Sequence, residues 1–360
     1  MSIKSSLKAK FGKTPLWKTA SECKYALTTA CSTICVSGAF LLGWCSYGKL
    51  KAFLRERNRR HKIMKAAAKG KDIAPTEYNG KRILTLEEAN ELIGNAIERG
   101  EPFMAARYGS VELEAVWIVR DDGKGFIRPA SRPLHMLHYS AGFFPKDKKL
   151  CIKFSELMKW ATSQADLMGV WWNPMEEYML GTYGSNVEYC RLHCLDPFAA
   201  PNPWSAKLEG KKVVVIHPFA DTIRSQYAKR ELLFPGKNVL PAFDLRIVRA
   251  VQTITGNKDD RFATWFEALD YMYNEAMSQD FDVAIIGCGA YGYPLAAKLK
   301  AAGKIAIHLG GVTQLLFGIR GKRWEVEYKG AYPEMMKNPA WVRPSERPER
   351  FETHEGGAYW

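Results

Sequence analysis

The stretch Asp282–Trp324, DVAIIGCGAYGYPLAAKLKAAGKIAIHLGGVTQLLFGIRGKRW, decides the fold class of this chain. An apolar run of strand length (Asp282–Ile286) meets a glycine cluster (Gly287–Gly292) and then a helical segment (Tyr293–Ala302), before a second strand (Lys304–Leu309). A strand that delivers glycines to a helix start exposes backbone N–H groups, which is how α/β proteins bind phosphate. The stretch therefore predicts the floor of a site for a nucleotide or another phosphorylated ligand.

The rest of the chain shows the same alternation of strands and helices. Apolar runs predict strands over Pro102–Ala106, Ala165–Trp172 and Lys211–Phe219. A capping box formed by Thr85 and Glu88 starts a helix over Leu86–Arg99. Further helices are expected within Phe143–Gln164 and over Ile223–Leu233 and Trp265–Ser278. This order predicts an α/β protein with a mostly parallel sheet and helices on both faces.

The charge of the chain is concentrated at its N-terminus. The formal net charge is +14 over 360 residues, yet residues 1–72 hold 16 lysines and arginines against three acids, and the remainder is nearly balanced. A nucleic-acid-binding fold normally carries its basic face on the folded body. The uneven distribution favours an anionic membrane surface as partner and argues against nucleic acid.

Residues 25–48 contain no charged side chain and are long enough to span a bilayer, which predicts a membrane anchor. A re-entrant or interfacial segment and a buried helix are the alternatives. The basic flank that follows places the folded body on the cytoplasmic face. The predicted division is a basic arm (1–24), the anchor or re-entrant helix (25–48), a basic juxtamembrane helix and linker (49–79), an α/β catalytic domain (80–324) and a tail rich in proline and charge (325–360).

Three predicted strand ends carry chemically active side chains, and ligands bind at such ends in parallel sheets. The first is Arg107–Glu112, where a turn is followed by Ser110 as helix N-cap, which places Glu112 and Glu114 in the first turns of that helix. Arg107, Gly109 and Ser110 are candidates for binding phosphate. Glu112 and Glu114 are candidate catalytic acids or bases.

The glycine cluster, with Gly287, Gly289 and Gly292 around Tyr291, matches the dinucleotide fingerprint in its strand–turn–helix context. The acidic residue that would bind the ribose about 20 residues later is absent, so no NAD is expected. Two explanations stay open, a cradle for phosphate or sugar and glycines needed only for tight packing.

The third strand end supplies Asp221, which is either a helix N-cap or a base. Near the C-terminus, a glutamine and a basic run are candidates for binding an anionic leaving group: Gln314, Arg320, Lys322 and Arg323. A solvated basic turn is the alternative for this run.

The segment Phe103–Ala115, FMAARYGSVELEA, resembles the glycosyltransferases of the GT-D fold, in which a strand ending in Arg-aromatic-Gly precedes Asp-x-Glu at a helix start. Together with the C-terminal strand–glycine–helix–strand unit, the resemblance covers roughly residues 80–324. It implies a Rossmann-like domain that acts in bacterial surface-glycan or glycoprotein assembly. Arg107 and Glu112 match the family's arginine and glutamate, whereas Ser110 stands in place of the aspartate.

In that family the Asp-x-Glu pair is associated with a divalent metal, Mn²⁺ or Mg²⁺, and a nucleotide-sugar diphosphate. A hydroxyl is a weaker ligand for a hard cation than a carboxylate, so Glu112 is left as the implied metal ligand and metal dependence stays open. The resemblance implies a membrane-associated glycosyltransferase that moves a sugar from a nucleotide-sugar to a glycan or lipid-linked acceptor in polysaccharide biosynthesis. The alternative is a non-catalytic nucleotide-binding regulator or scaffold of a polysaccharide assembly complex.

Overall fold

A computed structural model describes residues 47–328 and 331–360 of the chain. Within them, seven strands form one sheet in the order β5-β4-β3-β9-β8-β6-β7, and every neighbouring pair is parallel. The strands are β3 (Phe103–Ala106), β4 (Leu167–Val170), β5 (Glu188–Arg191), β6 (Lys212–His217), β7 (Asp244–Arg249), β8 (Val283–Ile286) and β9 (Ile305–His308). A small antiparallel pair, β1 (Glu77–Tyr78) and β2 (Lys81–Arg82), precedes the sheet.

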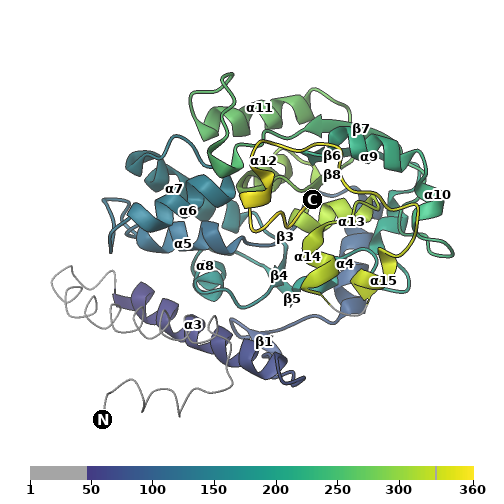
Figure 1. Ribbon diagram of the computed structural model, residues 1–360. Helices are drawn as coiled ribbons and strands as arrows, with labels where there is room; N and C mark the ends of the chain where they lie inside the picture. The colour runs from purple at the N-terminus through teal and green to yellow at the C-terminus, as the bar shows by residue number, and fades with distance from the viewer. Residues whose placement is uncertain (1–46, 329–330) are drawn as a thin grey trace, which may run out of the picture. The chain divides into compact units, whose positions relative to one another are not determined.

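The central strands are buried on both faces, as parallel sheets require. On one face, α12 (Gly292–Ala301) packs on β3, β8 and β9 and contacts α7 (Lys148–Ser163) and α11 (Trp265–Met277). On the other, α4 (Leu86–Arg99) and α9 (Ala220–Tyr227) share one hydrophobic core with alternate residues of the strands. Figure 1 shows the strands at the centre with helices around them. The predicted α/β architecture with a parallel sheet is confirmed.

The remaining elements are shorter or lie at the edges. The helices are α3 (Tyr47–Ala67), α5 (Ser110–Ile118), α6 (Ser131–Ala141), α8 (Glu176–Tyr183), α10 (Arg230–Leu233), α13 (Thr313–Leu316), α14 (Lys322–Val326) and α15 (Ala331–Met335). The 3₁₀ turns are η2 (Leu192–Leu195), η3 (Trp204–Leu208), η4 (Ile254–Gly256), η5 (Gly289–Tyr291), η6 (Gly310–Val312) and η7 (Phe351–Thr353).

Local sequence signals placed several elements correctly. The capping box of α4 is present in both directions, and Gly100 ends this helix in a left-handed conformation. The unit β8–α12–β9 lies within one residue of its predicted limits. The predicted helix Ile223–Leu233 is instead two helices, α9 and α10, and Gly109 rather than Ser110 occupies the N-cap position of α5. The edge strands β5 and β7 and helix α6 were not predicted.

The C-terminal segment, predicted as a wrapping or disordered tail, wraps around the α/β body. Val342 forms a parallel β-bridge with Ile319, and Trp341 is fully buried in the core. Glu346 accepts hydrogen bonds from the backbone amides of Asp221 and Thr222 at 2.7 and 3.1 Å and so caps the N-terminus of α9. The tail is therefore part of the folded body.

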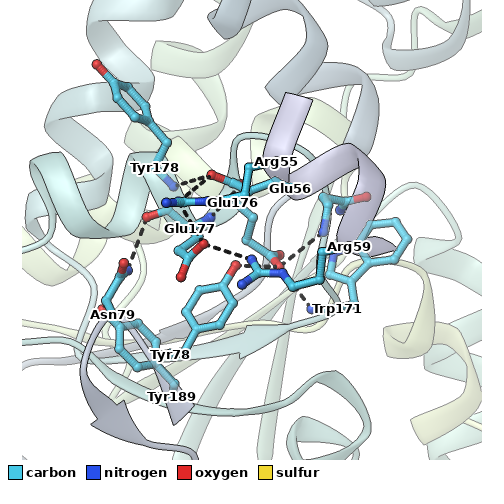
Figure 2. Close-up of polar contacts among 11 residues, drawn as sticks. Arg55, Glu56, Arg59, Tyr78, Asn79, Trp171, Glu176, Glu177, Tyr178 and Tyr189 are labelled. Carbon is cyan, nitrogen blue, oxygen red and sulfur yellow. Dashed lines mark hydrogen bonds and ion pairs between the residues drawn. The ribbon is translucent and has the colours of Figure 1, made fainter. Parts of the chain in front are cut away.

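The basic helix α3 also packs on that body, because Lys51–Trp360 form one compact unit. Glu56, which is fully buried, accepts hydrogen bonds from the backbone amides of Glu177 and Tyr178, each at 3.1 Å, at the start of α8 (Figure 2). Arg55 and Arg59 bind the carboxylate of Glu177 at 3.0 and 2.9 Å. The stretch 49–79 is thus attached to the domain that the sequence placed after it.

The predicted membrane segment, residues 25–48, lies outside the described residues except for its last two positions. Among the helices that the structure describes, none combines the length and the apolar character needed to cross a bilayer.

Replacing Glu56 by glutamine is expected to change the pH dependence of stability. Burial, assisted by Glu177, raises the pKa of Glu56 to about 8 from an ordinary value of 4.5. A raised carboxyl pKa contributes stability that is complete below the unfolded value and is lost as the pH rises through about 8. Between pH 5 and 8, wild type should therefore lose more than about 1 kcal/mol relative to Glu56→Gln.

Urea unfolding followed by tryptophan fluorescence at several pH values measures this difference. Glu91→Gln, on the exposed side of α4, is the matched control. A stability difference between wild type and Glu56→Gln that stays constant with pH would contradict the assignment of a buried, protonated Glu56.

Candidate functional site

A cavity of about 450 Å³ lies at the carboxyl ends of the sheet strands. Its wall contains the residues at the ends of four neighbouring strands, namely Arg107 (β3), His308 (β9), Gly287 (β8) and His217 (β6). The chain continues from β6 to β7 on one side and from β8 to β9 on the other, so the cavity lies where the connections diverge. Parallel sheets bind ligands at such a switch point.

Arg107 is held at this edge by the end of β4. Its Nε and Nη2 donate to the carbonyl of Tyr108 at 3.1 and 2.9 Å, and the same carbonyl accepts from Trp171 Nε1 at 3.1 Å. The guanidinium carbon lies 4.8 Å from the centroid of the Trp171 ring, a cation–π geometry. Arg107 Nη1 makes no hydrogen bond with any described residue, and so it is available to a ligand in the cavity.

Glu112, in the first turn of α5, lines the cavity together with Arg107. Its side chain folds back over Gly109, since a Cβ built on that glycine would lie 1.9 Å from Glu112 Oε2. Burial raises the pKa of Glu112, while its own backbone N–H and Arg107 oppose the shift and Glu355 adds to it. A desolvated carboxylate beside a guanidinium is an arrangement suited to proton transfer.

Two neutral histidines complete the strand ends. His217 Nδ1 accepts from the backbone amide of Phe219 at 3.0 Å, which leaves the ring proton on Nε2 as a donor. Burial lowers the pKa of His217 and of His308 to about 3. Both ring nitrogens of His308 are buried without a hydrogen-bond partner among the described residues. Buried polar atoms are normally satisfied, so His308 is a candidate for contact with a bound ligand or water.

The predicted glycine turn separates into two kinds of position. A Cβ on Gly287 would lie 2.5 Å from Thr313 Oγ1, and one on Gly292 would lie 2.7–2.9 Å from three ring atoms of His308. These two glycines are needed for close packing. Gly289, at φ +58°, faces open space on the cavity wall. Tyr291 lines the cavity but is buried, with its ring stacked on Trp265.

Several predicted site residues lie away from the cavity. Glu114 binds Arg128 at 3.1 Å, and Asp221 binds Arg249 at 2.6 Å, an interaction that lowers the pKa of Asp221. Neither acid lines the cavity, so their positions do not favour the predicted role as bases. The N-terminus of α9, which could have held phosphate, is occupied by the carboxylate of Glu346.

The C-terminal candidates act mainly in anchoring the tail. Arg320 donates to the carbonyl of Trp341, Lys322 donates to the carbonyl of Gly356, and neither lines the cavity. Gln314 lies on the cavity wall, but its amide nitrogen donates to three backbone carbonyls. These hydrogen bonds to backbone carbonyls compete with the predicted role of Arg320, Lys322 and Gln314 as anion ligands.

Arg323 does line the cavity, together with the end of the tail. Its Nη1 donates to the hydroxyl of Tyr359 at 2.9 Å, and its Nη2 is ion-paired with Glu355. Trp360 also contributes to the wall. The charge of Arg323 is therefore compensated within the protein, in contrast to Arg107.

No protein-family profile matches this chain, and no curated protein sequence matches it. Solved structures that resemble it include one described as the highly conserved domain of unknown function 1792, with a distinct glycosyltransferase fold. That comparison gives a TM-score of 0.37 and 13% identity over 64% of this chain and 78% of that chain. A selenomethionine-substituted structure of the same domain gives a TM-score of 0.40 and 11% identity over 76% and 93%.

These neighbours are structures of a domain with a glycosyltransferase fold, the class of fold that the segment Phe103–Ala115 resembles.

The residues around Glu112 do not form a metal site of their own. Within the described residues, no three histidine, cysteine or carboxylate side chains converge on a common point. Ser110 offers only a hydroxyl, and Glu355, the carboxylate that influences Glu112, is ion-paired with Arg323. A hard divalent cation prefers several carboxylate oxygens, so this donor set does not fit the metal that the family resemblance implies.

Sequence reasoning missed part of the wall. Trp171, which directly follows β4, and Tyr359 and Trp360 of the tail were not among the predicted site residues. The position of Trp171 near the end of the predicted strand Ala165–Trp172 was a usable signal, because β4 ends at the same sheet edge. Nothing local in the sequence indicated that the tail would reach the cavity.

The two kinds of glycine predict different costs of substitution. Alanine at Gly287 or Gly292 should destabilise by about 1–3 kcal/mol, because the new methyl group meets backbone or a buried ring. Alanine at Gly289 meets no atom and should cost only about 1 kcal/mol, from its left-handed backbone. Thermal unfolding of the three variants checks this order. Greater destabilisation of Gly289→Ala than of both others would contradict the packing assignment.

Proposed function

We propose that this protein is a glycosyltransferase that moves a sugar from a nucleotide-sugar donor to a glycan or a lipid-linked acceptor. The observation that carries the proposal is that Arg107 and Glu112 line the same cavity, at the carboxyl ends of the sheet. The cavity volume of about 450 Å³ lies within the usual range for small-molecule sites.

The first chemical requirement is stabilisation of the departing nucleoside diphosphate. Arg107 supplies a permanent positive charge, and its Nη1 lacks a partner among the described residues, so it can donate to a phosphate oxygen. Neutral His217 can donate from Nε2 to an oxygen of the ligand. Such preorganised donors are most effective in a site from which water is excluded.

The second requirement is removal of a proton from the acceptor hydroxyl. Glu112 is the base in this proposal, because it faces the cavity and its burial raises its pKa towards the working pH. No step is routed through a metal ion, since the donor set around Glu112 does not fit one. The aromatic side chains of the wall, Trp171, Tyr328 and Tyr359, offer surfaces for a base or sugar ring.

We further propose that the protein works at the cytoplasmic face of a membrane, with residues 25–48 as the attachment. The exposed lysines of α3 and the following segment, Lys51, Lys62, Lys65, Lys69 and Lys71, support attraction to anionic lipid. This location would bring a lipid-linked acceptor close to the cavity.

The alternative function is a nucleotide-binding regulator or scaffold without catalysis. The observations that favour it are Ser110 in place of the family's aspartate and the lack of a convergent metal-ligand set in the described residues. Under this alternative a nucleotide-sugar would bind but would not be consumed.

Substitution at Arg107 and Glu112 separates the two functions. We expect Glu112→Gln to reduce the release of nucleoside diphosphate at least about 100-fold, because the base is lost. Arg107→Ala should weaken donor binding as well as turnover. The assay measures nucleoside diphosphate released from a panel of nucleotide-sugars in the presence of candidate acceptors.

Glu114→Gln, on the same helix but outside the cavity, is the matched control and should keep wild-type activity. Wild-type activity should also rise with pH through a midpoint above 4.5, the ordinary value for this carboxyl, and Glu112→Gln should remove that limb. Full activity of Glu112→Gln would refute the assigned base, and donor binding without turnover in wild type would favour the regulator.

Metal addition is expected to change donor binding little. We expect nucleotide-sugars to raise the melting temperature by similar amounts with Mn²⁺, with Mg²⁺ and with a chelator, because Arg107 rather than a metal compensates the diphosphate. A thermal-shift series makes this comparison. Stabilisation that requires Mn²⁺ or Mg²⁺ would show that Glu112 and the ligand hold a metal together.

A further inference from the structure

We infer that Arg60 of the basic helix α3 is a ligand-binding residue of the cavity and forms, with Arg107, a two-arginine site for a phosphate group. The inference rests on the proposed function for the identity of the ligand but adds a residue from outside the predicted catalytic domain. It makes α3 a component of the site in addition to its proposed contact with a membrane.

Helix α3 is fixed against the helices that follow β3 and β4. Glu56 caps the N-terminus of α8, and Arg55 and Arg59 bind Glu177 (Figure 2). One turn earlier, Phe53 stacks on Trp117 of α5 with ring centroids 4.1 Å apart and an interplanar angle of 9°. These contacts hold α3 against both α5 and α8, the helices that follow β3 and β4.

The loop between β4 and α8 is held in place by a buried carboxylate. Buried Glu176 accepts hydrogen bonds from the backbone amides of Trp171 and Asn173 at 3.1 and 3.3 Å. The loop includes Trp172 and Met175 with φ angles of 58° and 75°, a conformation that costs energy in residues other than glycine. The Glu176 hydrogen bonds therefore hold the Trp171 backbone in a conformation that the loop would not favour alone.

Arg60 contacts the same tryptophan ring as Arg107. Its guanidinium carbon lies 4.8 Å from the centroid of the Trp171 ring, the same distance as that of Arg107. The two guanidinium groups therefore cannot be farther apart than twice this distance, and both line the cavity. Two guanidinium groups, Arg60 from α3 and Arg107 from the end of β3, thus contact the same indole ring.

Arg60 differs from its neighbours Arg55 and Arg59 on α3 in having no directly bound anion among the described residues. Arg55 and Arg59 are ion-paired, whereas Arg60 makes no hydrogen bond and no ion pair with any described residue. Burial lowers the pKa of Arg60, which indicates a partly desolvated guanidinium, and the nearby carboxylate of Glu176 opposes this shift without a hydrogen bond or ion pair to Arg60. A desolvated cation without a partner is costly, and an anion bound in the cavity would remove that cost.

Phosphate is the anion that this arrangement fits best. Guanidinium groups present planar sets of N–H donors that match phosphate oxygens, and two of them compensate its double negative charge. The phosphate could belong to the nucleotide-sugar donor or to a lipid-linked acceptor. Both share the chemistry that Arg60 and Arg107 recognise.

Arg60→Ala tests the inference in the full-length protein. Calorimetric titration would use a nucleoside diphosphate, inorganic pyrophosphate and a short-chain prenyl phosphate as probes. We expect Arg60→Ala to weaken the binding of at least one of these probes about tenfold or more, and to make that binding less dependent on salt. A loss of affinity for the nucleoside diphosphate would show that Arg60 binds a phosphate of the donor. A loss of affinity for the prenyl phosphate alone would show that it binds the phosphate of the lipid-linked acceptor.

Lys62→Ala, an exposed position on the same helix, is the control and should bind all probes like wild type. Arg60→Lys keeps the charge without the planar fork and should retain intermediate affinity, so it serves as the test if Arg60→Ala unfolds. Affinities within twofold of wild type for the folded Arg60 variants would overturn the inference, as would a wild-type protein that binds none of the probes. Arg60-dependent binding of pyrophosphate without any nucleotide-sugar turnover would refute the proposed function but keep the phosphate site.

Discussion

The parallel register of the central strands is the constraint on which the site depends. Ile216 of β6 is level with Ile286 of β8, which is level with His308 of β9. On the other side, Ala105 of β3 is level with Ile307 of β9. Because these strands end together, the residues after them meet at one edge although they are far apart in the sequence. A slip of one residue in any of these strands would move its side chains to the opposite face of the sheet and shift its end residue away from the common edge.

Trp171 contacts both Arg60 and Arg107 on the cavity wall. Its indole N–H shares the Tyr108 carbonyl with Arg107, and its ring contacts the guanidinium groups of Arg107 and Arg60. Its backbone is held by Glu176, a buried acid whose pKa burial raises to about 7. The tryptophan side chain has only two χ angles, and its backbone is held by a buried carboxylate, so it is a rigid support. The long arginine side chains that pack on it lose less conformational entropy when they bind a ligand.

The charged groups of the cavity differ in whether another residue of the protein compensates their charge. Arg323 is neutralised by Glu355, and the two strand-end histidines are uncharged because burial lowers their pKa values. Arg107 and Arg60 keep guanidinium donors that no described residue accepts. The positive charge available to a ligand is therefore placed at the β3–β4 end of the cavity, beside Glu112. A reaction that separates an anionic leaving group from an acceptor proton needs both features close together.

Local sequence patterns determined the elements and their order. The Thr85–Glu88 capping box, the glycines after β8 and the apolar runs predicted α4, β8, α12 and β9 closely, because helix caps and strand–turn–helix signals act over a few residues. The position of Arg107 and Glu112 at a strand end also followed from the sequence. The edge strands β5 and β7 escaped prediction because their burial and pairing depend on neighbours elsewhere in the chain.

Only the tertiary structure decided which candidates share the cavity. Glu114 and Asp221 have the chemistry of bases, but Arg128 and Arg249 bind them away from it. Gly287 and Gly292 match a phosphate-binding pattern, yet a Cβ built on them would clash with Thr313 and His308, so both positions are required for packing. Arg60 and Tyr359 reach the wall from opposite ends of the chain. Ion pairing and close packing between residues distant in sequence produce these outcomes. A local sequence pattern does not specify which distant residues come into contact.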